Sequence, residues 1–397
     1  MLVLVCNVGS TSLKYKLYEM PSEAVLCESR IERVGSRGKG IFHYKNLITG
    51  TAVFKEGVDV PGYREGIELF ISSMTSAECG VVASIDEVAA VGFKTVLSKG
   101  YYQVHELNDA VLEGMREYLC VAPAHNAHYL EAIETFKELL PHKTLIGVFE
   151  TAFHTTMPAE AYIYSTPYEW FEKYEIRRMG YHGASHRYIA ETIGSMSATH
   201  RLISCHLGGS GSLCAIKDGR SVDTSFGLSL QTGIPHANRV GDIDPYILVY
   251  LMKKEGLTLD EVLAELNTQS GLLGISGISN DMREVEQAAL AGNERAELVL
   301  KIYCRDIVKY IGAYTALLGG LDYLVFTGGI GENSKLVRKR ILGAIAHMGI
   351  EIDEEKNEQL QGFGEITTED SRVKAFVIPA NEELGIARSV YRELAQS

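Results

Sequence analysis

Short apolar runs and amphipathic helical stretches alternate along the whole chain. Residues 2–6 form an apolar run, followed by a turn of glycine and serine and then by alternating polar and apolar residues from 12 to 18. This alternation is typical of a strand with one buried face, so these residues predict a β-hairpin. In residues 108–119, by contrast, apolar side chains recur at helical spacing behind Asn108, which predicts a helix capped by that residue.

The remainder of the chain continues in the same way. We expect a second helix from Asn126 onward, and the sequence TLDE at 258–261 is a capping box that opens another. Residues 293–318 predict a long helix that ends before two glycines. Residues 321–342 predict a buried strand, a glycine turn and a helix, and residues 373–394 a strand and a last helix. Interleaved strands and helices, with hairpins that imply antiparallel pairs, indicate an α/β fold with mixed sheets.

One strand–turn–strand pattern occurs twice. The apolar run that contains Cys6 matches the run that contains Cys205, and each is followed by a Gly/Ser turn and a Ser-Leu pair, at Ser12 and Ser212. A single distant repeat of this kind suggests two similar domains that face each other, and not a solenoid. The alternative left open by these residues is a chance match between two common Gly/Ser turns.

The composition of the chain limits the classes of ligand that it is expected to bind. The chain has 397 residues, of which 46% are hydrophobic, and its formal net charge is −13. A chain of this length can bury a substantial core and divide into two domains. No Lys/Arg cluster is concentrated enough to hold a nucleic-acid backbone, and no apolar stretch is long enough to span a bilayer. We therefore expect a small-molecule ligand, with no nucleic acid and no membrane. Seven cysteines without CxxC spacing predict free thiols in a reducing cytoplasm.

Three glycine turns could cradle phosphate, at residues 9–12, 208–212 and 328–333. Backbone N–H groups in such turns can converge on phosphate oxygens because no side chain blocks the approach. No GxxxxGK[ST] sequence occurs, and no strand is followed by GxGxxG, which argues against P-loop and Rossmann nucleotide sites. Two phosphate hairpins with a third glycine turn are the arrangement of the actin-like, sugar-kinase and Hsp70 group of ATP-binding proteins.

Further segments indicate which family within this group the chain resembles. They follow the same order as in that family over essentially the whole chain. They are APAHNAHYLEAI (122–133), VFETAFHTTMP (148–158), YEIRRMGYHGASHRY (174–188), NRVGDIDP (238–245), GLLGISGISNDMREVE (271–286), GGIGENS (328–334) and VIPANEELGIA (377–387). Together with NVGSTSLKYKL at the start, they resemble the acetate kinase family of acetate and propionate kinases. The resemblance implies two actin-like (ribonuclease H-like) domains, each a mixed sheet flanked by helices, with a cleft between them. We expect residues 1–149 and 381–397 in the first domain and 150–380 in the second.

The resemblance also implies a reaction. It is Mg²⁺-dependent transfer of the γ-phosphoryl group of ATP to a short-chain carboxylate, which gives ADP and an acyl phosphate, in a cytoplasmic homodimer. Acetate or propionate is the first acceptor that the family suggests. A carboxylate is already ionised at neutral pH, so the protein needs no general base. It must instead position two anions and supply positive charge to the phosphoryl oxygens.

By the same resemblance, several groups of residues surround the reactants. The residues expected at phosphoryl transfer are Lys94, His125, Glu150, His182 and Arg239. Those expected to hold Mg²⁺ are Asn7 and Glu382, with Glu383 as the alternative to Glu382. Those expected to line the acyl pocket are Val96, Ala124, Tyr181 and Leu230. Those expected around the nucleotide are Asn7, Ser10, Ser12, Lys14, His206, Gly208, Gly209, Ser210, Gly211, Asp281, Met282, Arg283, Gly329, Ile330, Gly331, Glu332 and Asn333.

Some of these positions depart from the family's pattern. Lys94 stands where the family has arginine, Glu150 where it has aspartate, and Gly209 where it has asparagine. Lysine keeps the positive charge but gives up the bidentate fork of arginine. Because glutamate is one methylene longer than aspartate, Lys94 and Glu150 could compensate for each other as a pair. The small side chain of Ala124 and the hydroxyl of Tyr181 predict a larger, partly polar acyl pocket.

Two alternatives follow from these departures. The first keeps the chemistry but moves it to a longer or hydroxylated carboxylate. The second is a catalytically weak, nucleotide-binding paralogue with a regulatory role. The spacing of His182 and His186 also matches a zinc pair, but the HExxH glutamate is missing, so we assign no zinc site.

Overall fold

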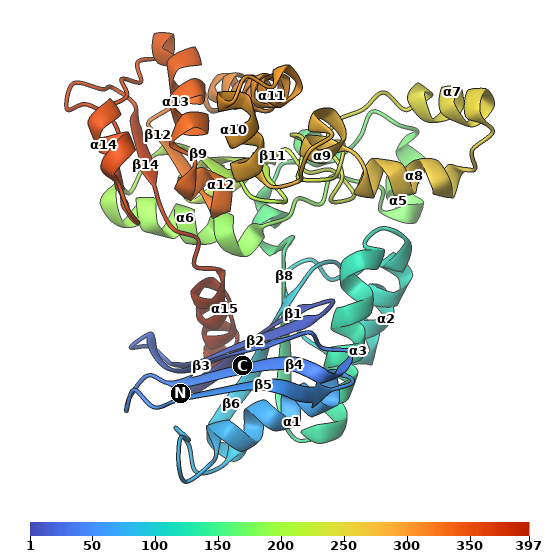
Figure 1. Ribbon diagram of the computed structural model, residues 1–397, viewed down its shortest axis with the longest axis vertical. Helices are drawn as coiled ribbons and strands as arrows, with labels where there is room; N and C mark the ends of the chain where they lie inside the picture. Colours follow the sequence, from blue (N-terminus) through green and yellow to red (C-terminus); the bar gives the residue numbers. More distant parts are fainter. Residues whose placement is uncertain (397) are drawn as a thin grey trace. The chain divides into compact units, whose positions relative to one another are not determined.

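The computed structural model describes residues 1–396, and for Ala124 the backbone alone. The chain divides into two compact units (Figure 1). The first comprises Met1–Thr155 together with the C-terminal segment from Asn381, and the second comprises Thr156–Ala380. The expected boundary lay between residues 149 and 150. The observed one lies after Thr155, so Glu150 belongs to the first unit.

The first unit is built on an eight-stranded mixed sheet. Its strands are β1 (Leu2–Gly9), β2 (Ser12–Glu19), β3 (Ala24–Glu32), β4 (Ser36–Asn46), β5 (Ala52–Val60), β6 (Val88–Thr95), β7 (Val104–Glu106) and β8 (Thr144–Phe149). They lie in the order β5-β4-β3-β2-β1-β6-β8-β7. β1 pairs antiparallel with β2 and parallel with β6, and β6 pairs parallel with β8. The predicted hairpin and the predicted mixed sheet are both confirmed.

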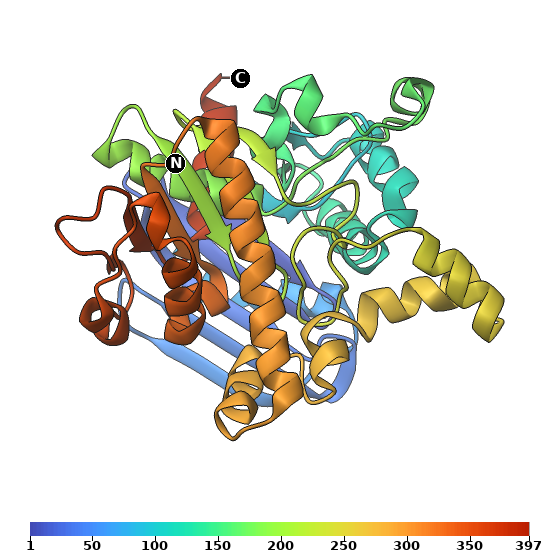
Figure 2. The same cartoon turned by 90° about the horizontal axis from the view of Figure 1, so that it is seen from above.

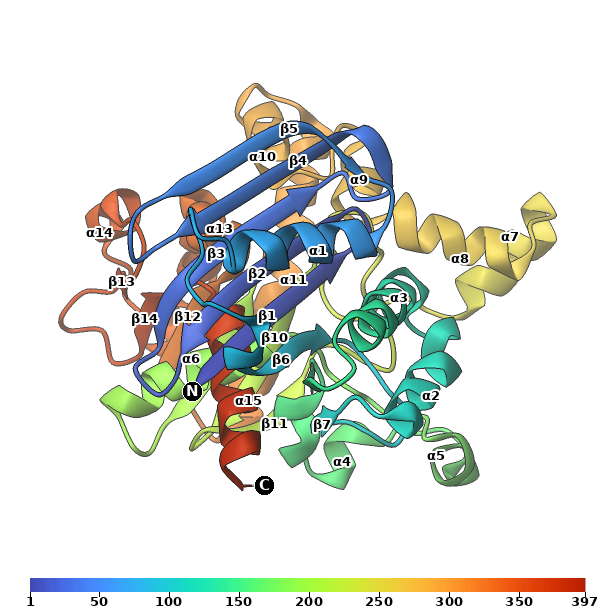
Figure 3. The same ribbon diagram turned by 90° about the horizontal axis from the view of Figure 1, so that it is seen from below.

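Helices cover both faces of this sheet. They are α1 (Tyr63–Met74), α2 (Asp109–Glu117), α3 (Pro123–Leu139) and α15 (Glu382–Gln396). α1 lies across the strands on the face that carries Leu13 (Figure 3), where Gly66 lets the helix approach closely. α15 packs on the opposite face, against β1 and β6. A Cβ on Gly92 would lie 2.6 Å from the Val390 side chain, so this glycine permits the close packing of α15.

The second unit contains a six-stranded mixed sheet. Its strands are β9 (Arg201–His206), β10 (Ser212–Lys217), β11 (Arg220–Thr224), β12 (Tyr323–Thr327), β13 (Gly364–Glu365) and β14 (Lys374–Val377). Helix α6 (Gly183–Met196) packs on β9, and the long helix α11 (Glu294–Leu318), orange in Figure 2, packs on β9 and β10. The other helices are α4 (Ala159–Tyr162), α5 (Tyr168–Tyr174), α7 (Tyr246–Glu255), α8 (Leu259–Thr268), α9 (Gly271–Ser276), α10 (Met282–Leu290), α12 (Gly328–Asn333), α13 (Lys335–Ala344) and α14 (Glu354–Gln359).

The sequence repeat is a repeat of topology. The order β3-β2-β1-β6-β8-β7 in the first sheet corresponds to β11-β10-β9-β12-β14-β13 in the second. In both, the first three strands form an antiparallel meander, the next two pair in parallel, and the edge strand is antiparallel. A chance match of two turns would not extend over six strands, so that alternative is excluded.

Most predicted helix boundaries are confirmed by their caps. The Asn108 side chain accepts from the backbone N–H of Val111, Thr258 forms its capping box, and α11 ends at Gly319 in the left-handed conformation. Two expectations were wrong. The helix expected from Asn126 begins at Pro123, because proline is tolerated at the first helical position. The glycine turn at 328–333 is the short helix α12.

All seven cysteines are free thiols, and Cys120 is the exposed one. Within residues 1–396, none of the helices combines the length and the apolar character that a membrane crossing requires.

Candidate active site

The first unit brings one lysine between two carboxylates. Lys94 lies near the end of β6, Glu150 directly follows the neighbouring parallel strand β8, and Glu382 opens helix α15. The Lys94 ammonium lies 2.8 Å from Glu150 Oε1 and 2.6 Å from Glu382 Oε2. We call these three residues the lysine–carboxylate cluster. Parallel strands end at the same sheet edge, which is why residues far apart in sequence meet here.

Both carboxylates keep Lys94 charged. Burial disfavours the ammonium form, but Coulomb attraction to Glu150 and then to Glu382 outweighs it, so the pKa of Lys94 lies well above its usual value. The Glu150 side chain is only 5% exposed, and a buried carboxylate of this kind requires a paired cation. Lys94 is therefore a fixed positive charge at neutral pH, held between two carboxylates.

Asn7 is oriented by a tyrosine that the sequence analysis did not identify. The buried Tyr129 hydroxyl donates to Asn7 Oδ1 at 3.2 Å and accepts from the Val8 backbone N–H at 3.3 Å. Because the amide oxygen is engaged, the NH₂ group of Asn7 is the part oriented toward other acceptors. Tyr129 lies one helical turn after His125 in α3, and no motif in the sequence links it to Asn7.

His125 lies in the first turn of α3 and is half-buried. Its neighbour Asn126 is fully buried, and Nδ2 of Asn126 donates to the carbonyl groups of Leu97 at 2.8 Å and Met115 at 2.9 Å. These bonds fasten the start of α3 to the loop that follows Lys94 and to helix α2. They fix the backbone from which His125 projects.

The residues of this unit fit a magnesium ion that is bound mainly through a substrate. Mg²⁺ prefers oxygen ligands and commonly takes one or two carboxylates together with substrate phosphates. The cluster offers two carboxylates on one ammonium, and no group of three or more His, Cys, Asp or Glu side chains placed to hold a metal occurs among the described residues. The structure brings Glu382 to Lys94, whereas Glu383 lines a separate groove.

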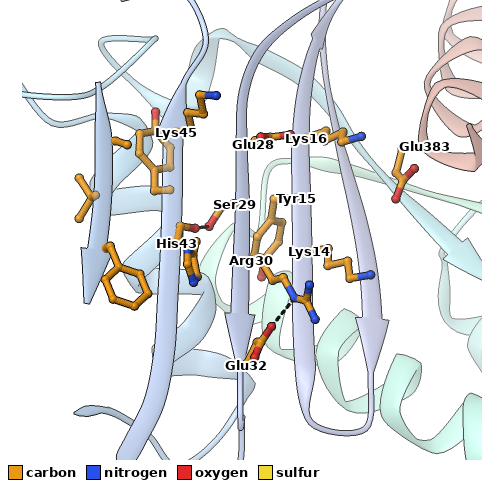
Figure 4. A pocket seen from close by; sticks show the side chains of 14 residues that line it. Lys14, Tyr15, Lys16, Glu28, Ser29, Arg30, Glu32, His43, Lys45 and Glu383 are labelled. Atoms are coloured by element: carbon orange, nitrogen blue, oxygen red, sulfur yellow. Dashed lines mark hydrogen bonds and ion pairs between the residues drawn. The ribbon is translucent and has the colours of Figure 1, made fainter. Parts of the chain in front are cut away.

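That groove crosses β2 to β5 on the face that carries Lys14 and Lys16 (Figure 4). It has a volume of about 560 Å³, and its lining mixes Lys14, Lys16 and Arg30 with Glu28 and Glu383. Strand register places Asn7 opposite Lys14 and Gly9 opposite Ser12, so these residues share one face of the first hairpin, while Ser10 is exposed in the turn.

The second unit contains a pocket of about 700 Å³ at its glycine turns. Eight of its lining residues were expected around a nucleotide, namely Gly208, Gly209, Asp281, Met282, Arg283, Gly329, Ile330 and Asn333. The sequence analysis missed Ala237, Asn280, Glu286 and Ser334. Gly328 has φ +76°, and a Cβ there would lie 2.8 Å from the Leu207 carbonyl oxygen, so glycine is required for the close approach of α12 to β9.

Asp281 and Arg283 form the polar wall of this pocket. Asp281 caps α10 by accepting from the Arg283 backbone N–H at 2.9 Å, and its carboxylate also pairs with the guanidinium. These hydrogen bonds lower the pKa of Asp281 to about 2. Among the other residues expected around the nucleotide, Glu332 makes hydrogen bonds within the unit. Its Oε1 accepts from the backbone N–H groups of Gly328 and Ala380. Gly331 donates to the Leu207 carbonyl.

Three histidines gather at the second hairpin. The rings of His182 and His206 stack with centroids 4.1 Å apart, and Phe226 contacts both His182 and His236. His206 Nδ1 lies 2.8 Å from Ser185 Oγ, and the Gly211 N–H donates to His236 Nδ1 at 3.1 Å. The Ser210 hydroxyl is buried in the turn, without a hydrogen-bond partner among the described residues.

Arg239 is half-buried beside this cluster. Burial lowers its pKa, and its Nε is buried with no hydrogen-bond partner among residues 1–396. Burial and then the charge of Arg239 lower the pKa of His236 to about 3, so His236 is neutral. We call Arg239, His182, His206 and His236 the arginine–histidine cluster. A buried donor without a partner costs free energy, which an anionic ligand would recover.

Comparison with known proteins decides the family. The model of the acetokinase family matches residues 2–388. The chain belongs to the acetokinase family. An acetate kinase of Treponema denticola is 44% identical over 393 residues, which cover 98% of each chain. An acetate kinase structure from Porphyromonas gingivalis superposes with a TM-score of 0.88 at 37% identity and covers 99% of each chain. A propionate kinase structure from Francisella tularensis gives 0.88 at 33% identity, with 98% of each chain covered.

Membership of the acetokinase family establishes the actin-like fold and a phosphotransferase with a carboxyl group as acceptor. The expected acyl-pocket residues are divided between the two units. Val96 is buried in the first, and the Ala124 side chain lies outside the described residues. Tyr181 and Leu230 are buried in the second, where the Tyr181 hydroxyl donates to the Leu228 carbonyl at 2.5 Å. The Tyr181 hydroxyl, which was expected to make the acyl pocket partly polar, therefore has a hydrogen-bond acceptor within its own unit.

Proposed function

We propose that this acetokinase-family member transfers the γ-phosphoryl group of ATP reversibly to acetate or propionate by direct in-line transfer. The observation that supports this most strongly is Arg239, a half-buried arginine whose buried Nε has no hydrogen-bond partner among the described residues. It lies beside neutral His236, and Phe226 contacts the rings of both His236 and His182. A planar fork suits a carboxylate and a phosphoryl group better than a point charge does.

In the proposed reaction, Arg239 holds the acceptor carboxylate while His182 and His125 donate hydrogen bonds to the phosphoryl oxygens. Lys94 adds positive charge, held in place by Glu150 and Glu382. A carboxylate oxygen attacks phosphorus as the bond to the ADP oxygen breaks, and no proton moves. Mg²⁺, when bound by Glu382, the Asn7 region and the phosphates, would neutralise charge on the nucleotide.

The ATP site that we propose is the pocket of the second unit. Its glycine turns can receive phosphates, and Asp281, Met282 and Arg283 wall the side on which the adenosine would lie. Arg283 is 84% exposed, so it can move onto a ligand at little cost. Ser10, Ser12 and Lys14 of the first hairpin are assigned to the phosphate end.

The choice of acceptor depends on the acyl pocket. A hydroxylated acid would need a polar partner, and the Tyr181 hydroxyl already donates to Leu228. Because the hydrogen of this hydroxyl is engaged, Tyr181 cannot also donate to a polar group on the acid, which favours acetate or propionate. The regulatory paralogue loses support because Lys94 and Glu150 still meet at ion-pair distance despite the two departures.

We further propose a cytoplasmic homodimer that forms through helices α7 and α8. Five large apolar side chains on these helices are exposed, namely Tyr246, Ile247, Val249, Tyr250 and Leu259. Tyr246 is 78% exposed and Tyr250 65%. Such a patch is typical of a surface that another chain covers. Free thiols are consistent with a reducing compartment.

Hydroxylamine trapping tests the proposed function. The protein is incubated with MgATP and one acid at a time, from acetate to butyrate with their 2-hydroxy and 2-oxo analogues, and acyl hydroxamate is measured. Fastest turnover with acetate or propionate supports the proposal. Fastest turnover with a longer or hydroxylated acid would instead identify that acid as the acceptor. Nucleotide binding without turnover on any acid would support the regulatory paralogue instead.

A further inference from the structure

A chain of hydrogen bonds lies behind His182. Ser212 Oγ lies 2.9 Å from His182 Nδ1 and 2.9 Å from His186 Nε2, and the other nitrogen of His186 lies 2.9 Å from Ser204 Oγ. Ser204, His186 and Ser212 are completely buried, and His182 is 7% exposed. The phosphoryl-transfer account above uses His182 but none of the other three residues.

The protons in this chain are coupled. Ser212 has a single hydroxyl hydrogen, so it can donate to only one of its two imidazole neighbours and must accept from the other. If it donates to His182 Nδ1, then His186 donates through Nε2 and accepts at Nδ1 from Ser204. Neutral His182 then carries its hydrogen on Nε2. In the reverse arrangement all three bonds invert, and Nε2 of neutral His182 carries a lone pair.

We propose that Ser204, His186 and Ser212 are positioning residues that fix His182 as the Nε2–H tautomer, so that His182 donates to the transferring phosphoryl group. The inference rests on the proposed function in that it takes an anion to be the partner of Nε2. A lone pair at Nε2 would repel a phosphoryl oxygen, whereas an N–H group donates to it. The partner on Nδ1 selects the tautomer, as in other catalytic histidines.

The backbone supports a fixed orientation of the ring. His182 has φ +56°, in the left-handed region, at the position that precedes α6. A non-glycine residue there is strained and persists when its surroundings hold it. The stacked His206 ring and the edge of Phe226 restrict rotation of the imidazole about its own axis. The hydrogen bonds of Ser212 consequently couple the tautomer of His182 to that of His186.

The tautomer can be measured directly. The protein is labelled with ¹⁵N-histidine, and the ring signals of His182 are assigned by their loss in a His182→Gln variant. The proposal predicts a protonated Nε2 and an unprotonated Nδ1 at pH 7.5, and a shift of the hydrogen toward Nδ1 in Ser212→Ala. A wild-type ring protonated on Nδ1 would overturn the proposal. This readout needs no turnover, so it remains decisive if the proposed kinase activity is not found.

Steady-state kinetics of serine variants provide a second test of the proposal. In Ser212→Ala we expect kcat to fall about 10- to 100-fold with KM for ATP unchanged, since a displaced donor costs less than a missing one. Ser204→Ala, one step further along the chain, should have a smaller effect of the same kind. Ser221→Ala is the matched control, because Ser221 is equally buried in the same sheet and its hydroxyl lies 3.3 Å from Cys214 Sγ. Equal kcat in Ser212→Ala and Ser221→Ala, with an unchanged ¹⁵N spectrum, would contradict the relay.

Discussion

Lys94 Nζ lies 2.8 Å from Glu150 Oε1, where two neighbouring parallel strands end. The shorter cation and the longer carboxylate therefore meet at ordinary ion-pair distance. This geometry is what mutual compensation between the two departures from the family's pattern requires. The compensation can therefore be measured as a coupling free energy between positions 94 and 150.

A double-mutant cycle tests that coupling. Lys94→Arg alone should crowd Glu150, and Glu150→Asp alone should leave a gap, so each should lower kcat/KM about tenfold. The double variant should recover most of the loss, which corresponds to a coupling of about 1–3 kcal/mol. Lys99→Arg and Glu117→Asp form the control pair, because that exposed pair is joined at 2.7 Å on the surface. Additive losses at Lys94 and Glu150 would refute the compensation.

Variants of Arg239 should separate the contribution of its positive charge from that of its forked shape. Arg239→Lys keeps the charge but loses the fork, and each lost charge-assisted hydrogen bond is worth about 1.5–3 kcal/mol. We expect kcat/KM for the carboxylate to fall about 10- to 100-fold, and further in Arg239→Met, with KM for ATP little changed. Arg201→Lys, at a surface pair with Asp322, should stay near wild type. Full activity in Arg239→Lys would remove the arginine from its proposed role.

His236 should make the stability of the protein depend on pH. Its pKa is lowered to about 3 in the native state by burial and Arg239, whereas an unfolded histidine titrates near its ordinary value of 6.5. Between these values the unfolded state binds more protons, so the free energy of unfolding falls as pH decreases, by at most about 1.4 kcal/mol per pH unit from this residue.

Urea denaturation at pH 7.5, 6.5 and 5.5 measures this slope. His236→Gln should be less stable than wild type at pH 7.5 but should lose less of its stability on acidification. His43→Gln, at an exposed position, should keep the wild-type slope. An unchanged slope in His236→Gln would show that other groups account for the acid sensitivity.

The exposed face of α7 should be an interface. Tyr250→Glu places a charge in the centre of the apolar patch, so we expect the dimer to dissociate at micromolar concentration, as measured by light scattering. Leu298→Glu is the control, since Leu298 is 49% exposed on α11. A monomeric wild-type protein, or a Tyr250→Glu dimer as stable as wild type, would contradict the proposed interface.

Much of the fold could be predicted from local signals. The repeated hairpins, the cap at Asn108 and the glycine end of α11 are short-range features, and the structure confirms them. The start of α3 was misplaced because Pro123 is compatible both with a helix stop and with a first helical position.

The candidate site could be predicted less completely. Lys94 and Glu382 are far apart in sequence, and only the parallel pairing of β6 with β8 and the packing of α15 bring them together. Tyr129 and Glu332 illustrate the limit, because the roles of both depend on hydrogen bonds to backbone groups of distant segments. No periodicity or motif in a single sequence encodes such contacts.

Transfer of phosphoryl directly to a carboxylate is the central claim, and ³¹P NMR with ¹⁸O-labelled acid tests it most directly. The protein is incubated with MgATP and acetate or propionate in which both carboxyl oxygens are ¹⁸O. The account predicts ADP and an acyl phosphate whose ³¹P signal carries the isotope shift of a bridging ¹⁸O. Unshifted inorganic phosphate as the sole product, or AMP with pyrophosphate, would contradict it.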